Sequence, residues 1–273
     1  MTTTPVNRPA VAAGRSPGDA GIAFRQLQFE QKAFWRNPAG AVFTFAFPLL
    51  FLVIFSTLNS GARIAERGNI TFVTFFVPGI LAFGLISACY TNLAIRMTIS
   101  RDYGILKRVR GTPVPTWAYL GGQIGSSVLI TMILLVLTVG LGVVAFGVDF
   151  RTGTAGGLVV TLGLGAACFC ALGLAVSGLC PNADAAPAIV NFSIFPLLFI
   201  SGIFFPLDTA PPWLRSVARV FPMQRLADGL QYAFDPRTKG LGFNGGDLWV
   251  LLAWTAVGAF LALRLFRWDP VKE

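Results

Sequence analysis

Residues 119–146 read YLGGQIGSSVLITMILLVLTVGLGVVAF, and none of these 28 residues carries a charge. A helix of this length rises about 1.5 Å per residue and is therefore long enough to cross the ~30 Å hydrocarbon core of a bilayer. Apolar and polar residues do not alternate along the stretch, as they would in a strand of a membrane barrel. The stretch predicts a transmembrane helix and sets the fold class of the chain.

Five more apolar segments accompany this one. Of the 273 residues, 55% are hydrophobic and 12% are charged, which leaves too few polar groups to cover a water-soluble globule of this size. The segments contain no Asp, Glu or Lys. We therefore predict an all-α integral membrane domain over residues 21–273 with six transmembrane helices, at about 40–58, 71–95, 119–146, 155–179, 185–205 and 248–266.

The basic residues indicate which side of the membrane each loop faces. Six crossings put both chain ends on one side, and that side holds thirteen Lys and Arg when the loop between the second and third spans is included. The two short loops of the other side hold Arg63, Arg67 and Arg151. Because basic residues in short loops stay in the cytoplasm, both termini are expected there. The net charge of +9 thus reports sidedness and not a nucleic-acid partner.

Two segments precede the first span. Residues 1–20 are rich in Pro, Gly, Ala and Thr and contain no apolar run, which predicts a disordered cytoplasmic tail and not a signal peptide. Residues 22–36 place Leu27, Gln31 and Phe34 along one stripe, with basic residues opposite. This pattern predicts an interfacial helix on the inner leaflet. A merely solvated basic helix is the alternative.

The loop at residues 100–115 reads SRDYGILKRVRGTPVP. It is too long for a tight turn and too polar to be buried in lipid. Apolar Ile105, Leu106 and Val109 stand between its basic residues, which favours a short cytoplasmic helix that docks onto a partner. A loop that only signals topology would account for the arginines but not for these apolar residues.

The outer segment at residues 206–246 predicts two short amphipathic helices before the last span. Pro212 opens the first helix, with Asp208 or Thr209 as its cap, and the second follows Pro222. Such helices beside a bilayer can dip into it as re-entrant helices or act as a lid, and an ordinary structured loop is the alternative. The residues of interest are Pro206, Pro212, Trp213 and Pro222.

The chain lacks the residues of a catalyst. It has no His, and its spans cannot pair a nucleophile with a base. No Lys follows a Gly or precedes Ser or Thr, so the phosphate-binding loop of an ATPase is missing from the sequence. The four Cys lack metal-ligand spacing, and the spans offer no acidic relay for a proton-coupled carrier. We expect a non-catalytic protein without cofactor or metal, whose energy comes from elsewhere.

The pentapeptide FPLLF occurs twice, at residues 47–51 and 195–199. The copies fall in the first and fifth predicted spans, which run in the same direction. Pro48 and Pro196 each free a carbonyl one turn back and kink the helix, and kinked helices often form cavity walls. Coincidence in a chain rich in Phe and Leu is the alternative.

The order of these parts resembles that of the ABC type-2 exporter permeases, the membrane subunits of bacterial drug, polysaccharide and lipid exporters that include the daunorubicin-resistance type. The resemblance covers about residues 22–268. Its most specific pieces are FWRNP at 34–38, RDYGILKR at 101–108 with GTP at 111–113, and GIFFP at 202–206 followed by PWL at 212–214 and Pro222.

The resemblance implies that residues 100–115 form a coupling helix seated on a separate cytoplasmic ABC ATPase, which binds ATP and Mg. Two ATPase copies and two permeases, the second being another copy of this chain, would make the working unit within the membrane lipid. The implied contacts are apolar for Ile105, Leu106 and Val109, and ion-pairing at the rim for Arg101, Asp102, Lys107, Arg108 and Arg110.

The resemblance also implies that the first, second and fifth spans border the translocation path. The residues that we place there are Phe43, Phe47, Pro48, Phe51, Phe83, Tyr90, Asn191, Phe195, Pro196 and Phe199. Aromatic faces of this kind favour an amphipathic drug-like or lipid cargo, and hence multidrug efflux and antibiotic resistance. Lipid-facing Phe is the alternative at each position.

The expected mechanism is export driven from the cytoplasm. ATP binding would close the ATPases, the 100–115 element would move with them, and the kinked helices would switch the central cavity from inward-facing to outward-facing. Three other functions stay open at this point: a polysaccharide or glycolipid exporter, an ATPase-independent channel or carrier, and a structural scaffold.

Overall fold

The computed structural model describes residues 19–65, 68–112, 114–148, 152–207, 210–238 and 240–266. Most of the predicted tail, and the predicted cap residues Asp208 and Thr209, lie outside these ranges. Within them the predicted all-α class is confirmed. A short β ribbon pairs β1 (Arg63–Ile64) with β2 (Ile70–Thr71) in antiparallel register.

Five helical runs are long and apolar enough to cross a membrane, judged by length and composition. Each coincides with a predicted span, because each is an uninterrupted apolar stretch. The second run is continuous through α3 (Phe72–Ile86), the π-helical turn η2 (Ser87–Asn92) and α4 (Leu93–Asp102). The other four are α2 (Pro38–Leu58), α6 (Thr116–Phe146), α7 (Ala155–Ser177) and α11 (Gly245–Leu265).

The predicted span at 185–205 forms a shorter helix, α8 (Ala186–Phe199), of 14 residues. At about 1.5 Å per residue it is shorter than the hydrocarbon core of a bilayer. Beyond Phe199 the Oγ of Ser201 donates to the carbonyl of Leu198, and Gly202 adopts a left-handed conformation with φ 74°, which does not continue a helix. The helical extent predicted for this span was therefore wrong at its C-terminal end, and the count of six crossings stays a prediction.

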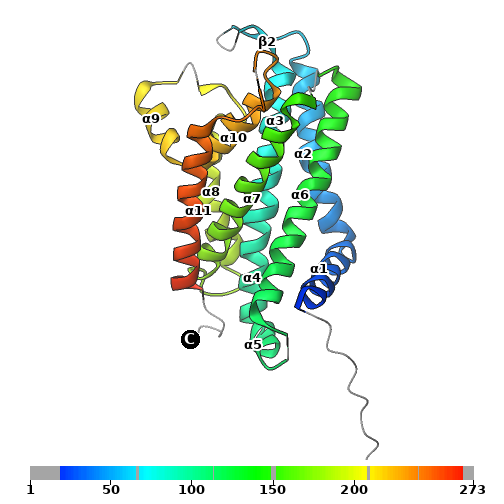
Figure 1. Cartoon of the computed structure of the whole chain (residues 1–273), viewed down its shortest axis with the longest axis vertical. Coiled ribbons are helices and arrows are strands. Elements are labelled where there is room, and N and C mark those ends of the chain that lie inside the picture. The colour runs from blue at the N-terminus through cyan, green and yellow to red at the C-terminus, as the bar shows by residue number, and fades with distance from the viewer. Residues whose placement is uncertain are drawn as a thin grey trace, which may run out of the picture.

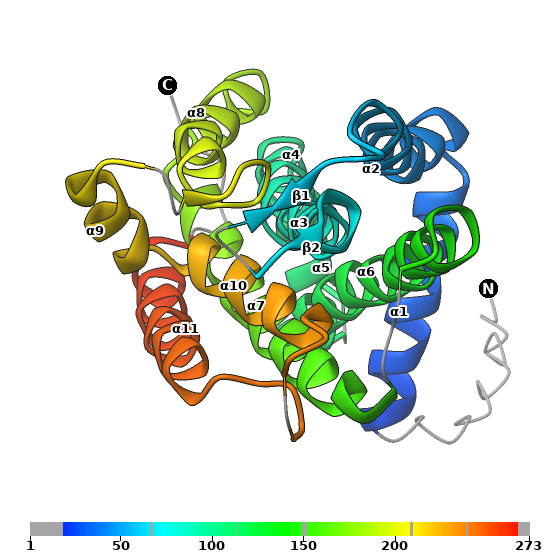
Figure 2. The same cartoon turned by 90° about the horizontal axis from the view of Figure 1, so that it is seen from above.

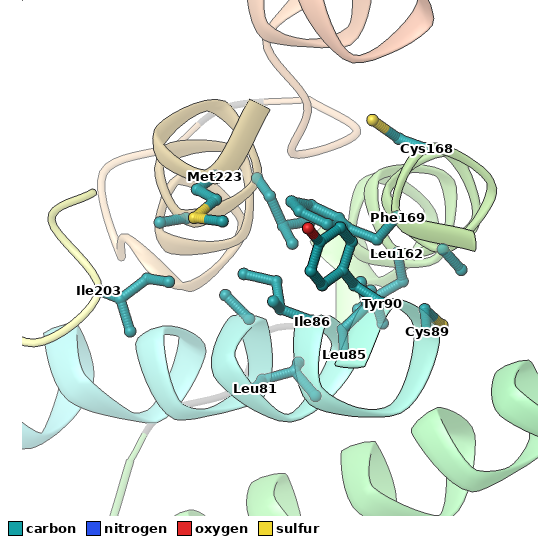
Figure 3. Packing of buried hydrophobic residues seen from close by; sticks show 14 of the residues in the cluster. Leu81, Leu85, Ile86, Cys89, Tyr90, Leu162, Cys168, Phe169, Ile203 and Met223 are labelled. Atoms are coloured by element: carbon teal, nitrogen blue, oxygen red, sulfur yellow. The ribbon is translucent and has the colours of Figure 1, made fainter. Parts of the chain in front are cut away.

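The core lies around α3, which stands in the middle of the bundle with α2, α6, α7 and α10 (Pro222–Phe234) around it (Figure 2). Figure 3 shows Leu85 of α3, Phe169 of α7 and Met223 of α10 packing together. The predicted second outer helix is thus confirmed as a helix, but it is buried in the bundle. Leu226 and Leu230 on its inner face have no exposed surface, so α10 is not a loose lid.

The molecule has two distinct ends (Figure 1). One end carries α1 (Asp19–Trp35) and the short α5 (Ile105–Arg110), and we call it the α5 end. The other carries the β ribbon, the C-terminal end of α10 and α9 (Pro212–Val220), and we call it the α9 end. A 3-10 turn (Thr152–Thr154) leads into α7. The described chain begins and finishes at the α5 end, as an even number of crossings requires.

Candidate functional site

The turn between α4 and α5 is anchored to the loop that follows α7. Arg101 is only 2% exposed. Its guanidinium donates to the carbonyl of Ser177 at 3.0 Å, to that of Pro181 at 3.4 Å and to that of Cys180. These carbonyls lie at and just beyond the C-terminal end of a helix, where carbonyls lack intrahelical partners and the helix dipole favours a cation. The rim position predicted for Arg101 is therefore wrong, because the residue is buried within its own chain.

Asp102 extends the same anchor. Its Oδ2 accepts a hydrogen bond from the backbone N–H of Ala183 at 2.9 Å, in the loop between α7 and α8. The carboxylate that we predicted to pair with a partner protein is thus engaged inside the chain. Together Arg101 and Asp102 fix the base of α5 to a loop about 80 residues further along the sequence.

The short helix α5 presents a basic surface at the tip of the α5 end. Gly104 makes the turn from α4 with φ 68°, a conformation that glycine adopts without strain. Leu106 is fully buried, so its predicted apolar contact with a partner is wrong. Val109 is half-buried and packs against the main core. The exposed side chains, which we call the α5 surface, are Tyr103, Ile105, Lys107, Arg108 and Arg110.

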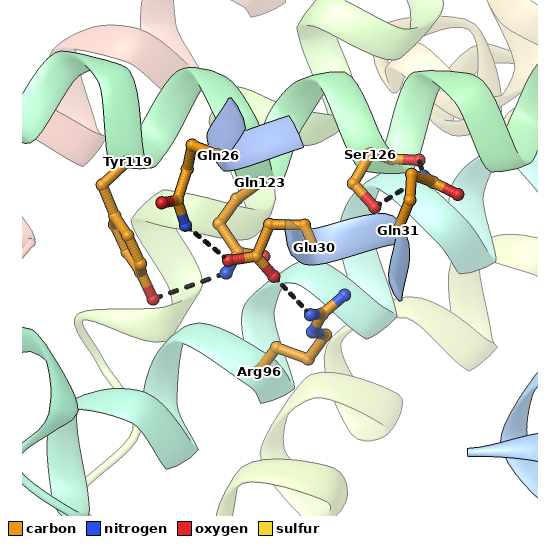
Figure 4. Close-up of polar contacts among 7 residues, drawn as sticks. All are labelled: Gln26, Glu30, Gln31, Arg96, Tyr119, Gln123 and Ser126. Carbon is orange, nitrogen blue, oxygen red and sulfur yellow. Dashed lines mark hydrogen bonds and ion pairs between the residues drawn. The ribbon is translucent and has the colours of Figure 1, made fainter. Parts of the chain in front are cut away.

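Helix α1 is held to the bundle by polar contacts (Figure 4). Glu30 is 3% exposed, and its carboxylate accepts from the Nη2 of Arg96 on α4 at 2.7 Å and from the Nε2 of Gln26 at 2.9 Å. Gln31 donates to the Oγ of Ser126 on α6 at 2.9 Å. Burial raises the pKa of the Glu30 carboxyl, and the charge of Arg96 opposes that rise.

These contacts change the interpretation of α1. The predicted stripe that includes Leu27 and Gln31 faces α6 and not the bilayer. The exposed apolar side chains are instead Phe24, Phe29 and Trp35. Sequence reasoning missed Glu30, although it is the one acid within residues 22–36 and follows Gln26 by four positions, an i, i+4 spacing that could have indicated a buried partner.

An apolar cavity of about 340 Å³ opens between α2, α3 and α8, and we call it the aromatic groove. Residues of both copies of the FPLLF repeat line it: Phe47 and Phe51 come from α2, and Phe195 and Phe199 come from α8. Figure 2 shows these two helices on the same side of the molecule, with α3 nearer the centre of the bundle. The lining side chains are Phe47, Phe51, Phe55, Phe83, Phe195, Leu198, Phe199, Phe204 and Phe205.

The rings of the groove contact one another in a chain from α2 to α8. The ring centroids of Phe47 and Phe83 are 6.1 Å apart, those of Phe83 and Phe204 are 5.8 Å apart, and those of Phe204 and Phe199 are 6.1 Å apart. These separations suit favourable aromatic pairs. Every lining side chain is apolar, so the groove can bind hydrocarbon and ring systems but offers no hydrogen-bond partner from its walls.

The remaining predicted path residues lie around the groove. Phe43 is 67% exposed and stacks on Phe47 with centroids 5.3 Å apart, and Pro48 is buried. The hydroxyls of Tyr90 in η2 and Ser193 in α8 are 2.6 Å apart and tie these two elements together. Asn191, which is half-buried, and Pro196, which is exposed, do not line the groove.

Sequence reasoning missed four lining residues. Phe55 lies one turn beyond Phe51 on α2 and could have been found by helical spacing. Leu198 belongs to the second repeat copy. Phe204 and Phe205 reach the groove only because the chain turns back after α8. The π-helical turn η2 was also not predicted, and such turns inside helices occur frequently at functional sites.

Long uncharged helices around an open apolar groove suit movement of a molecule through a bilayer, which is the task of a transport permease. Comparison with known families agrees with this class. The family described as ABC-2 type transporter matches residues 25–234. The chain belongs to this family, and it is a membrane permease subunit of an ABC transporter.

Several named proteins are similar to the chain over most of its length. It is 28% identical to the daunorubicin resistance ABC transporter permease protein DrrB1 of Streptomyces coeruleorubidus, over 97% of this chain and 95% of that protein. It is 25% identical to the inner membrane transport permease YadH of Escherichia coli K12, over 82% and 84%. It is 22% identical to the probable multidrug ABC transporter permease YbhR of the same strain, over 73% and 54%.

The comparisons and the apolar helices together support a multi-pass protein of the bacterial inner membrane. The relatives are transport permeases, which are not catalysts. Membership of the family implies association with an ABC ATPase subunit.

Proposed function

We propose that this permease exports an amphipathic drug-like or lipid molecule from the cytoplasm or the inner leaflet, driven by a separate ABC ATPase subunit. The aromatic groove is the observation that carries the proposal. All of its lining side chains are apolar. Burial of apolar cargo surface against them stabilises the complex by about 25 cal/mol per Å². A polysaccharide would leave its hydroxyls without partners there. Two relatives bear names that refer to daunorubicin resistance and to multidrug transport.

The working unit in this proposal contains two copies of the permease and two ATPases. The groove is open, because Phe195 is 49% exposed and Phe199 is 68% exposed, and Phe192 beside them is 82% exposed. These three residues lie on α8. A second copy that packed its own α2 and α8 against this face would cover the exposed rings and enclose a shared central cavity.

Movement of the ATPase would be transmitted to the aromatic groove through one continuous helical run. The α5 surface would contact the ATPase, and Arg101 and Asp102 would oblige the α7–α8 loop to move with it. The run α4–η2–α3 leads from this anchor to Phe83 on the wall of the groove. Both chain ends and α5 lie in the cytoplasm in this proposal, as the positive-inside rule predicts.

The test is ATP-driven transport of an anthracycline into inverted vesicles that contain the permease and its ATPase subunit. Phe47→Ala combined with Phe195→Ala removes one ring from each wall of the groove. We expect kcat/KM for the anthracycline to fall about tenfold, which corresponds to about 1.4 kcal/mol of lost binding.

Phe260→Ala is the matched control, since Phe260 is an exposed ring on α11 that does not line the groove. This variant should transport at the unaltered rate. Equal transport by the double variant and the control would contradict the role of the groove. Accumulation without ATP would contradict the export mechanism.

A further inference from the structure

A second cavity, of about 400 Å³, lies at the α9 end and differs in chemistry from the aromatic groove. It is formed between α9, α10 and the start of α11, with β2 and the first turn of α3 beside it. Charged and amide side chains dominate its lining. Arg215 and Arg219 come from α9, Gln224 and Arg225 from α10, and Asp247 from α11.

The acidic groups of this cavity are already engaged. Asp247 pairs with Arg225 at 2.9 Å. Asp235 pairs with Arg237 at 2.8 Å, and Asp228 has a partner of its own. Arg215 and Arg219 differ, because no carboxylate of the described chain lies within ion-pairing distance of either. The cavity therefore presents two cationic groups that its own walls do not neutralise.

Two buried polar atoms in the cavity lack hydrogen-bond partners in the part of the chain that the structure describes. Gln224 is only 7% exposed, and its Oε1 accepts no hydrogen bond there. The Nε of Arg215 is buried and donates none. A buried polar atom without a partner costs free energy. The pair thus points to a ligand that brings an acceptor of negative charge for Arg215 and a hydrogen-bond donor for Gln224.

The outer side of α9 indicates where the rest of such a ligand would lie. Trp213, Val217 and Val220 are 66%, 43% and 60% exposed, although Arg215 on the same helix lines the cavity. Figure 1 places α9 at the edge of the bundle. A helix with an exposed apolar side and a Trp lies at the membrane interface, so acyl chains can cover this side while a headgroup enters the cavity.

We propose that the cavity binds the headgroup of a glycerophospholipid. Its phosphodiester is held by Arg215 and Arg219, and an amine or hydroxyl of the headgroup donates to the Oε1 of Gln224. Phosphatidylethanolamine and phosphatidylglycerol have such a donor, whereas phosphatidylcholine has the phosphodiester without it. The site does not depend on the cargo or on the ATPase of the proposed function.

The test is native mass spectrometry of the detergent-solubilised full chain, titrated with each lipid. The unaltered chain should bind phosphatidylethanolamine and phosphatidylglycerol about tenfold more tightly than phosphatidylcholine, the factor expected for one hydrogen bond to a buried acceptor. This comparison needs no variant, so it is independent of any folding defect. Equal binding of all three lipids would overturn the proposal.

Variants then assign the contacts. Arg215→Gln should weaken phosphatidylethanolamine binding about tenfold, and Gln224→Leu should abolish the preference over phosphatidylcholine. Arg63→Gln removes the same charge from an exposed position at the same end that does not line the cavity, and it should bind as the unaltered chain does.

A soluble competitor separates a lipid from a free phosphodiester. Glycerophosphoethanolamine carries the same headgroup without acyl chains, and it should compete only at far higher concentration. Competition at the same concentration as the lipid would show that the α9 face contributes nothing, and it would overturn the assignment to a membrane lipid. Unchanged lipid binding by both Arg215→Gln and Gln224→Leu would overturn the site itself.

Discussion

Arg101 is the residue on which the placement of α5 depends most directly. It is buried among the carbonyls of Ser177, Cys180 and Pro181, and its planar guanidinium reaches all three. A lysine is a point charge on a flexible chain and cannot reproduce this arrangement. The side chain therefore joins α4 to the α7–α8 loop by hydrogen bonds.

Removing the hydrogen bonds of Arg101 should destabilise the fold. We expect Arg101→Ala to lower the free energy of unfolding by about 3 kcal/mol and Arg101→Lys to rescue only part of the loss, measured by thermal unfolding in detergent. Arg108→Ala is the control, because Arg108 is exposed on α5. An unfolding midpoint for Arg101→Ala equal to that of the control would show that the hydrogen bonds of Arg101 do not stabilise the fold.

Glu30 makes stability depend on pH. Burial raises the pKa of the Glu30 carboxyl in the folded state above its usual value of 4.5, so the folded state holds the proton more tightly than the unfolded state. The free energy of unfolding therefore falls as pH rises from 4.5 through the pKa of folded Glu30. Above that window Glu30 adds no further dependence on pH. Glu30→Gln keeps a hydrogen-bond acceptor for Arg96 but does not titrate. Its unfolding midpoint should fall less with pH across the window, and parallel pH profiles for the two proteins would contradict this account.

Sequence reasoning found some of these residues and missed others for a physical reason. The FPLLF copies were visible as a repeat, and helical spacing then placed their rings on common faces. The partners of Glu30 and Arg101 lie 66 and 76 positions away along the chain. A local pattern does not report such distant contacts, so the sequence predicted an exposed rim position for Arg101 and gave no sign that Arg96 is the partner of Glu30.

At the scale of elements, length and hydropathy predicted the long helices and missed the end of α8. Five apolar stretches became helices of membrane-spanning length, because an uncharged backbone must satisfy its own hydrogen bonds in lipid. The sixth stretch is equally apolar through Phe205, yet its helix stops at Phe199. The carbonyl of Gly202 accepts from the Nε2 of Gln231 on α10, so a tertiary contact stabilises the turn that the composition did not reveal.

Helix α5 supplies a paired test of docking. Ile105 is 40% exposed, whereas its neighbour Leu106 is fully buried. We expect Ile105→Asp to abolish stimulation of the partner ATPase and to leave the thermal unfolding of the permease unchanged. Leu106→Asp places a charge in the core, so it should lower the unfolding midpoint strongly.

The contrast between these neighbours is what makes the test decisive. Full ATPase stimulation by the Ile105→Asp permease would show that the partner does not use this surface. Ile105→Glu should behave as Ile105→Asp does, whereas Ile105→Val should behave as the unaltered chain.

At the scale of the whole molecule, the two ends carry different chemistry. The α5 end exposes Lys107 and Arg108 on a short helix, and the α9 end carries a polar cavity beside an exposed apolar helix. The aromatic groove lies between them, and the continuous run α4–η2–α3 connects it to the α5 end. In the proposed function, a force applied at α5 would change the width of the groove, whose lining side chains are all apolar.

In the proposed mechanism the α5 surface faces the cytoplasm and is covered there by a separate ATPase subunit. The most direct measurement is labelling of a Lys107→Cys permease with a membrane-impermeant maleimide, since the four native cysteines are all buried. We expect rapid labelling in inverted vesicles, none in right-side-out vesicles, and protection when the ATPase subunit is added. Labelling from the outer side, or equal labelling with and without the ATPase, would contradict this mechanism.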